Sequence, residues 1–340
     1  MSISADNGRV LRIGLVRLLD AAPYLLAGEL GYYEEAGLRV ELSWELGWAT
    51  IKHKLAYGTL DGAHALAPAA LSIGAGYGVA PTPCRALMVT SRLGNAITLS
   101  SRIRERGVSS ADDFRAEVRS SRGQRIYKLG VVAMDSCHNF LMRQWLRSIR
   151  IDPDSDVKIV VIPPGQAVRN LRAGTLDGFC VGEPWNTVAV RDGIGWCPAI
   201  SDDLAPDHAE KVLLATQDRI DSRPAAFRAL VGALTKACQF CDDPENHSRL
   251  ARQMRRTGVL SSSAQGVEKV LRGEFDFGDG EGVQSRRIIS FTRSGDTSVT
   301  ASDVAWILNG AKNASWDGVD VEGLSALATE TYPSPELVAG

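Results

Sequence analysis

The sequence has no long apolar run and little excess charge, and these absences exclude several classes of protein. Of its 340 residues, 44% are hydrophobic and 23% are charged, and the formal net charge is -2. No stretch approaches the roughly 20 apolar residues needed to span a bilayer. The densest basic stretches, 102–106 and 119–125, are short and interrupted, unlike the clustered Lys and Arg of a nucleic-acid-binding surface. The composition is typical of a soluble globular protein, and the length favours two lobes or domains.

Cysteine is too sparse for the disulfide framework of a secreted domain. The six cysteines show no paired spacing: Cys84, Cys137, Cys180, Cys197, Cys238 and Cys241. Reduced thiols in a cytoplasm are the simpler interpretation. The last two form a lone CxxC inside a helical pattern, and a zinc site would need a second pair of ligands. We therefore expect neither a metal site nor a cofactor.

The first residues lack the features of an export signal. Residues 1–7 contain no Lys or Arg, and the first apolar stretch, 10–16, is interrupted by Arg12 and followed by Arg17. A secretory signal needs a basic segment followed by roughly 7–15 apolar residues. No cysteine precedes Cys84, so a lipid anchor at this end is not expected either. These observations predict a cytoplasmic protein.

An internal repeat is the most informative feature of the sequence. The pentapeptide GTLDG occurs at residues 58–62 and again at 174–178, an offset of 116 residues (174 minus 58). The same offset aligns residues 11–16 with 127–132 and Ala22 with His138. Self-similarity at a fixed offset indicates that one structural unit is present twice.

Strands and helices are expected to alternate in both copies of this unit. The expected strands are 11–16, 38–44 and 62–67 in the first copy and 128–133, 157–162 and 178–182 in the second. The expected helices are 22–35 and 49–57 in the first copy and 137–150 and 166–173 in the second. This alternation is typical of parallel βαβ units.

The repeat predicts an α/β protein of two lobes around a ligand cleft. Residues 1–100 and 205–340 are expected to form lobe I, and residues 101–204 lobe II. Lobe I would include C-terminal helices at 224–241, 245–256, 264–272 and 302–311. Ligands of open α/β sheets bind where strands end and helices begin, so the cleft between the two copies is the expected binding site.

Five segments carry a resemblance to a known family. They are GWAT at 47–50, DGAH at 61–64, FCVGEPWN at 179–186, HAEKVLL at 208–214 and FDFGDG at 275–280. In this order they resemble the nitrate- and bicarbonate-binding protein family of ABC importers, the NrtA/CmpA group, from about residue 10 to about residue 282. The resemblance implies the periplasmic-binding-protein type II fold, which agrees with the duplicated unit.

The resemblance also implies which residues bind the anion. Trp48 matches a tryptophan whose indole N–H donates to the anion, and Thr50 is expected to be an accessory donor. His138 matches a histidine at the start of the first helix of the second lobe, and Gly182 belongs to the same set. Asn95 stands where the family usually has Gln, a longer amide.

Lys211 matches the cation that distinguishes nitrate binders from bicarbonate binders in this family. Nitrate only accepts hydrogen bonds at neutral pH, so donors and one positive charge suit it. Bicarbonate carries a proton that it can donate, so its site benefits from a carboxylate acceptor. Lys211 therefore favours nitrate or nitrite as the ligand.

Several other polar residues have structural interpretations. Asp20 in the first copy and Asp135 or Ser136 in the second are expected to cap helices whose N-termini face the cleft. His64 is expected to be a buried, hydrogen-bonded strand residue. Glu183 is expected to support the connection between the lobes, because an acid beside a bound anion would repel it.

Three functions compete. The resemblance favours a cytoplasmic nitrate/nitrite sensor of the NasS type, which sequesters a NasT-like, ANTAR-type RNA-binding response regulator and releases it when the anion binds. The sensor would regulate nitrate assimilation by transcription antitermination without touching nucleic acid or membrane. The alternative is the substrate-binding component of a nitrate/nitrite ABC importer, which needs export or tethering. Enzymes of the same fold use a pyridoxal cofactor, a cysteine-rich motif and a reactive lysine; the sequence has no such cysteine cluster and no supported nucleophile–base pair, so it predicts no enzyme.

Overall fold

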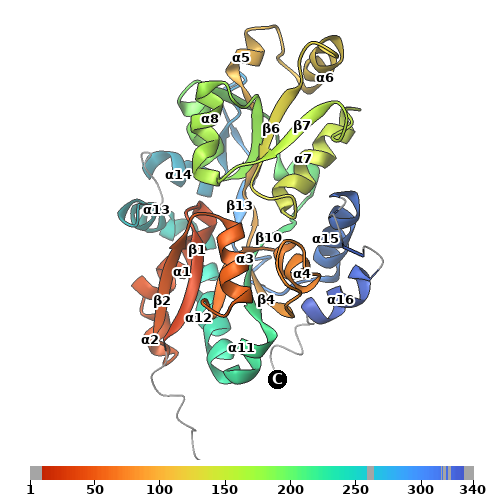
Figure 1. The fold of residues 1–340 in the computed structure, drawn as a ribbon. Coiled ribbons are helices and arrows are strands. Elements are labelled where there is room, and N and C mark those ends of the chain that lie inside the picture. The colour runs from red at the N-terminus through yellow and green to blue at the C-terminus, as the bar shows by residue number, and fades with distance from the viewer. Residues whose placement is uncertain (1–9, 259–263, 315, 317–318, 321–322, 333–340) are drawn as a thin grey trace, which may run out of the picture.

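The protein consists of two lobes, the first below the second in Figure 1. The computed structural model describes residues 10–258, 264–314, 316, 319–320 and 323–332. Each lobe contains a β-sheet with helices packed on it, so the predicted α/β class is confirmed.

The first lobe is built on a six-stranded sheet with the spatial order β13–β4–β10–β3–β1–β2. Its strands are β1 (Leu11–Val16), β2 (Val40–Glu45), β3 (Gly62–Leu66), β4 (Cys84–Leu93), β10 (Ala209–Thr216) and β13 (Ile289–Ser290). Its early helices are η1 (Leu19–Ala21), α1 (Ala22–Glu29), α2 (Tyr32–Glu35), α3 (Trp48–Ala56) and α4 (Ala69–Gly74). Strand β1 pairs in parallel with β2 and β3, whereas β10 runs antiparallel to β3 and β4.

The second lobe is built on a five-stranded sheet with the order β7–β6–β8–β5–β9. Its strands are β5 (Asn95–Ser100), β6 (Tyr127–Val131), β7 (Val157–Val161), β8 (Gly178–Gly182) and β9 (Gly195–Ile200). Its helices are α5 (Ser101–Arg104), α6 (Ala111–Ser120), α7 (Cys137–Ser148), η2 (Pro164–Gln166), α8 (Ala167–Ala173), α9 (Trp185–Arg191) and α10 (Ser201–Leu204).

The two copies of the repeat have the same local construction. In each, the first strand pairs in parallel with the second and third, as predicted. Gly14 and Gly130, which the repeat aligns, both lie where a side chain would not fit. A Cβ at Gly14 would approach Leu60 to 2.5 Å, and one at Gly130 would approach Ile162 to 2.7 Å. The lack of a side chain at Gly14 therefore lets Leu60 pack against β1, and the lack of one at Gly130 lets Ile162 pack against β6.

The chain passes from the first lobe to the second between β4 and β5 and returns to the first lobe between β9 and β10. Strand β4 ends the first sheet at Leu93, Gly94 follows with a φ of 89°, and β5 begins the second sheet at Asn95. Strand β5 pairs with β8 and β9, whereas the sequence assigned residues up to 100 to lobe I. All six residues of β5 are buried, so the strand has no polar face that would indicate which sheet it joins.

The C-terminal part contacts both lobes. Its elements are α11 (Gln217–Ser222), α12 (Pro224–Asp242), η3 (Pro244–Asn246), α13 (His247–Arg256), α14 (Ala264–Leu271), β11 (Glu274–Asp276), β12 (Val283–Ser285), α15 (Ala301–Ala314) and α16 (Leu324–Thr331). Helix α12 packs on α1 and β4 of the first lobe. Helix α15 instead packs on α7 of the second lobe, where Trp306 meets Phe140 at a ring-centroid distance of 5.9 Å. The buried pair Arg92–Asp303, 2.8 Å apart, fixes the start of α15 to β4.

No helix among the described residues combines the length and apolarity needed to cross a bilayer. All six cysteines are buried free thiols, including both members of the CxxC in α12. Within the described ranges, no group of three or more His, Cys, Asp or Glu side chains is arranged to hold a metal ion.

Candidate functional site

Five of the six predicted site residues come together between the lobes. Trp48 begins α3, just after β2, and Lys211 lies on β10; both belong to the first lobe. His138 is the second residue of α7, Asn95 begins β5 and Gly182 ends β8, so these three come from the second lobe. The side chains of Trp48, Asn95, His138 and Lys211 are each at most 2% exposed.

The aromatic rings and the lysine are in direct contact. The ring centroids of Trp48 and His138 are 5.8 Å apart, and the Lys211 ammonium lies 5.3 Å from the centroid of the Trp48 ring. A cation at this distance from an indole face is attracted by the quadrupole of the ring. The tryptophan, the histidine and the lysine therefore form one buried cluster across the lobe boundary.

Lys211 is held between two carboxylates. Its Nζ lies 2.8 Å from Asp20 Oδ2 and donates a hydrogen bond of 2.6 Å to Glu210 Oε1. Burial alone would lower the pKa of Lys211, but the two negative charges outweigh burial and raise it. Lys211 is therefore charged at neutral pH, as the predicted role of a cation in the site requires.

Glu210 contacts several members of the cluster, and the sequence analysis did not predict it as a site residue. Its carboxylate accepts hydrogen bonds from Asn95 Nδ2 at 2.7 Å and from Lys211, and it lies 3.1 Å from His208 Nε2. It also lies 3.6 Å from His138 Nε2, which is too far for a hydrogen bond. Burial alone would raise the pKa of Glu210, but the nearby Lys211 and histidines lower it well below its usual range. Glu210 is therefore an ionised, fully buried carboxylate.

A local irregularity of β10 explains how Glu210 and Lys211 enter the same cluster. Successive residues of a regular strand point to opposite faces of the sheet. The register of β10 against β4 shifts between Ala209 and Lys211 and again between Lys211 and Val212. Such shifts re-aim side chains next to functional sites. Regular alternation would have separated the carboxylate from the ammonium.

Asp20 is also part of the cluster, and its predicted role as a helix cap is wrong. It lies in the short turn η1, and no side chain caps α1. Its carboxylate pairs with Lys211 and lies 3.0 Å from Nε2 of His64. Burial alone would raise the pKa of Asp20, but the charges of Lys211 and His64 lower it. His64 is fully buried on β3, as predicted, and lies beside this carboxylate, but among the described residues neither of its ring nitrogens makes the predicted hydrogen bond.

The side-chain amide of Asn95 donates a hydrogen bond from its nitrogen, and its oxygen has no hydrogen-bond partner among the described residues. Its Nδ2 donates to Glu210, and this fixes the amide because a carboxylate can only accept. A Cβ at Gly182 would lie 3.5 Å from Asn95 Oδ1, so this glycine leaves room beside the amide. Thr50 is half-buried on α3 and, among the described residues, makes no side-chain hydrogen bond to this cluster.

Several polar atoms in the cluster are buried without a hydrogen-bond partner in the described part of the chain. They are Trp48 Nε1, Asn95 Oδ1, Asp20 Oδ1 and both ring nitrogens of His138 and of His64. Buried polar atoms are nearly always satisfied in folded proteins, so a group of unsatisfied atoms at one place indicates a ligand site. Burial lowers the pKa of His138 to about 4. The ring is therefore neutral at pH 7 in the ligand-free protein.

A second set of buried polar contacts joins the lobes beside the cluster. Lys52 of α3 donates to Asp135 at 2.6 Å, and Ser72 of α4 donates to the same oxygen. Asp135 precedes α7, so this pair links the first lobe to the second. Ser136 caps α7 by accepting from the N–H of Asn139. Of the two residues predicted as caps, Ser136 therefore is the cap, whereas Asp135 binds Lys52 and Ser72.

Glu183 also lies at the lobe boundary. Its main-chain carbonyl accepts from the N–H of Leu19 at 2.9 Å, and its own N–H donates to the carbonyl of Gly94 at 2.8 Å. Burial raises the pKa of its carboxyl to about 7. The main-chain bonds tie this segment to the first lobe, consistent with the predicted structural role.

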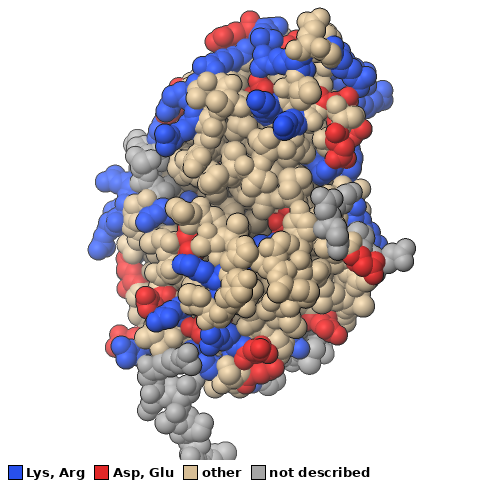
Figure 2. Space-filling view, viewed as in Figure 1, with Lys and Arg blue, Asp and Glu red and all other residues tan. Residues whose placement is uncertain are grey.

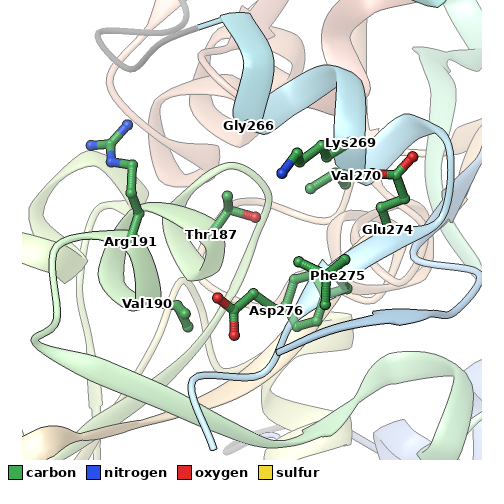
Figure 3. A pocket seen from close by; sticks show the side chains of 10 residues that line it. Thr187, Val190, Arg191, Gly266, Lys269, Val270, Glu274, Phe275 and Asp276 are labelled. Carbon is green, nitrogen blue, oxygen red and sulfur yellow. The ribbon is translucent and has the colours of Figure 1, made fainter. Parts of the chain in front are cut away.

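Two hollows lie near the lobe boundary. One, of about 570 Å³, is lined by Val16, Trp44 and Leu46 of the first lobe and by Pro163 and Trp185 of the second. It lies at the ends of β1 and β2, close in sequence to Trp48. The other, of about 240 Å³, lies between α9 and the α14–β11 segment, and none of the predicted site residues lines it (Figure 3). The charged side chains of the cluster, Asp20, Glu210 and Lys211, are buried. The centre of the face in Figure 2, where the lobes meet, is mostly formed by residues other than Lys, Arg, Asp and Glu.

Comparison with known proteins finds relatives among proteins of nitrate and bicarbonate transport. The nitrate import ATP-binding protein NrtC of Synechocystis sp. is 37% identical over 316 residues, which cover 91% of this chain and 46% of that protein. The bicarbonate transport ATP-binding protein CmpC of the same organism is 40% identical over 250 residues, covering 73% of this chain and 37% of that protein. The chain thus spans less than half the length of these two relatives.

The fold matches a solved structure closely. The crystal structure of the periplasmic nitrate-binding protein NrtA from Synechocystis PCC 6803 superposes with a TM-score of 0.84 at 25% identity, covering 97% of this chain and 91% of that one. The predicted periplasmic-binding-protein architecture is therefore confirmed. These similarities are to solute-binding and transport proteins and not to metabolic enzymes, in agreement with the prediction from the sequence. Residues 4–255 match the family described as NMT1-like. The chain belongs to this NMT1-like family and, within it, to the NrtA/CmpA-like nitrate- and bicarbonate-binding proteins.

Proposed function

We propose that the protein is a cytoplasmic nitrate/nitrite sensor whose two lobes close on the anion and thereby release an RNA-binding partner. One observation carries the proposal: unpartnered hydrogen-bonding atoms of Trp48 and His138 meet a charged lysine in a buried cluster between the lobes. An acceptor-only monoanion fits such atoms because Trp48 donates from Nε1 and the lysine supplies positive charge.

The distribution of these residues over both lobes couples binding to closure. Trp48 and Lys211 belong to the first lobe, and His138 belongs to the second. An anion that touches all three is bound only when the lobes are together. A ligand shifts a conformational equilibrium by its difference in affinity for the two states, so it would stabilise the closed form. A partner that prefers the open form would then be released.

The relatives support a location inside the cell. NrtC and CmpC, which match this chain over part of their lengths, are named as ATP-binding proteins. ATP is an intracellular nucleotide, so a segment of this kind carried by an ATP-binding protein is expected to meet its anion in the cytoplasm. The partner would be a NasT-like RNA-binding response regulator, and transcription antitermination would be the output.

A second candidate function is supported by the NrtA structure. That protein is described as periplasmic and nitrate-binding, and it covers 97% of this chain. The chain would then be the substrate-binding component of a nitrate/nitrite ABC importer. The two functions share one anion site and differ in the protein that responds to closure.

The identity of the anion is testable by ligand stabilisation. A ligand that binds only the folded protein stabilises it by RT ln(1 + [L]/Kd), about 2.7 kcal/mol at about 100 times the Kd. Nitrate and nitrite are expected to raise the Tm by several degrees in differential scanning fluorimetry. Bicarbonate is the matched comparison, because Glu210 and the unused oxygen of Asn95 could accept from it. A shift with bicarbonate and none with nitrate or nitrite would refute the assignment of the ligand.

The role of the protein is tested with its partner. We expect the ligand-free protein to elute with a NasT-like response regulator in size-exclusion chromatography and to separate from it when nitrate is added. Binding of nitrate without any complex, combined with nitrate-dependent binding to an importer permease, would instead support the importer component.

A further inference from the structure

Two buried carboxylates already share the one lysine of the cluster before any anion enters. Asp20 and Glu210 face one lysine, Lys211. His208 lies between two acceptors, the carbonyl of Ala205 at 3.0 Å and the carboxylate of Glu210 at 3.1 Å. His64 lies 3.0 Å from Asp20, so each of the two carboxylates has a histidine beside it in addition to the shared lysine. An incoming monoanion would add a third negative group beside a lysine that already faces two carboxylates, which is unfavourable unless a proton accompanies the anion.

His138 is the group placed to correct this imbalance. It is fully buried, and neither ring nitrogen has a hydrogen-bond partner among the residues that the structure describes. Its Nε2 is directed toward the Glu210 carboxylate at 3.6 Å, and its ring lies beside Trp48. A neutral imidazole has one donor and one acceptor nitrogen, whereas a protonated one donates from both. Both Glu210 and nitrate only accept, so a ring between them is fully satisfied only as the imidazolium.

We propose that the site takes up one proton with each anion and that His138 receives it. This inference rests on the proposed anion site and adds a condition for its occupancy. The charged and titratable groups that face His138 are Glu210 and Lys211 of β10, His208 just before β10 and Asp20 of η1. The pair Lys52–Asp135 lies at the start of the same helix and is neutral as a pair.

The expected pH dependence follows from the free and bound states. In the free protein burial keeps the pKa of His138 at about 4, so the ring is neutral above about pH 5. A bound anion favours the protonated ring and raises this pKa. Between the free and bound pKa values each anion brings a proton, so the Kd for nitrate rises by up to tenfold per pH unit. Affinity therefore falls as the pH rises.

The test is isothermal titration calorimetry of the full chain with nitrate from pH 5.5 to 8. At each pH the titration is run in two non-binding buffers that differ in ionisation enthalpy. The expected result is uptake of close to one proton per nitrate at the lower pH values and a Kd that weakens toward high pH. Binding with no proton exchange and a constant Kd would overturn this inference and leave the proposed anion site standing. If neither nitrate nor nitrite binds at any pH, both proposals are wrong.

Three variants assign the proton to its site. His138→Asn keeps an amide donor but cannot titrate, so its Kd should no longer depend on pH. Glu210→Gln removes one negative charge from the cluster, so proton uptake should fall toward zero. His53→Asn is the matched control, because His53 is exposed on α3, and it should retain the wild-type proton uptake. Undiminished proton uptake in folded His138→Asn would show that another group receives the proton, contrary to the inference.

The ring ¹⁵N resonances of His138 in the wild-type protein provide a readout that needs no variant: they should move to imidazolium values when nitrate is added.

Discussion

Replacing Lys211 with methionine is expected to abolish anion binding and to destabilise the fold. Methionine is similar in length but carries no charge, so Asp20 and Glu210 would remain buried without their cation. Removing one partner of a buried ion pair typically costs about 3–5 kcal/mol. The affinity for nitrate should fall by about 100-fold or more, since about 2.7 kcal/mol corresponds to that factor. Urea denaturation measures the first effect, and calorimetry measures the second.

Lys236→Met is the control for this substitution. Lys236 pairs with Glu35 at 3.3 Å, but both side chains are about 60% exposed, and exposed pairs contribute about 0–1 kcal/mol. The control should therefore behave like the unmodified protein in both measurements. If Lys211→Met kept the wild-type affinity for nitrate, Lys211 would not be part of the anion site.

Replacing Asp135 with alanine is expected to open the cleft. Asp135 accepts from both Lys52 and Ser72, and these contacts join the second lobe to the first. Without the carboxylate, Lys52 keeps its hydrogen bonds to Tyr77 O and Ser72 but is a buried charge without a counter-charge when the lobes are closed, and opening lets water reach it. The closed form should lose about 1–3 kcal/mol, which lowers the apparent affinity for the anion by about 5- to 150-fold. Small-angle X-ray scattering should show a larger radius of gyration at subsaturating nitrate.

The matched control is Asp154→Ala. Asp154 pairs with Arg143 at 3.0 Å, but both residues belong to the second lobe, so the pair does not bridge the cleft. This variant should keep the affinity and the dimensions of the unmodified protein. An Asp135 variant with unaltered anion affinity would mean that the Lys52–Asp135 contact does not contribute to closure.

The fold could be predicted in detail because it is repeated. The GTLDG pair and the aligned Gly14 and Gly130 fix the same tight strand packing at two places. The expected strands and helices are observed within a few residues, except that the expected helix 22–35 is divided into α1 and α2 at Gly31. The C-terminal helices were also predicted, because their apolar periodicity is strong. What the sequence could not indicate is that α15 packs on α7, since only the fold brings Trp306 to Phe140.

The candidate site was predicted only in part, for reasons that lie in the local backbone. Trp48, His138, Gly182 and Lys211 were placed by resemblance, and the structure brings them together. Glu210 was missed because regular strand alternation would place it on the face opposite Lys211, and only the shifted register of β10 allows both to meet.

Asp20 and Asn95 illustrate a second limit of the sequence. An aspartate before a helix is usually a cap, and nothing local distinguishes a cap from a partner of a lysine far along the chain. Likewise, an amide in a pocket can donate or accept, and the choice at Asn95 is made by Glu210. Both outcomes depend on a carboxylate–lysine cluster that forms only in the folded protein.

The most direct test of the central claim is a crystal structure of the protein grown with saturating nitrate. We expect a planar anion between the lobes, within hydrogen-bond distance of Trp48 Nε1 and His138 and close to the Lys211 ammonium. Nitrate bound elsewhere, or closed lobes with this cluster unchanged and no anion beside it, would contradict the account.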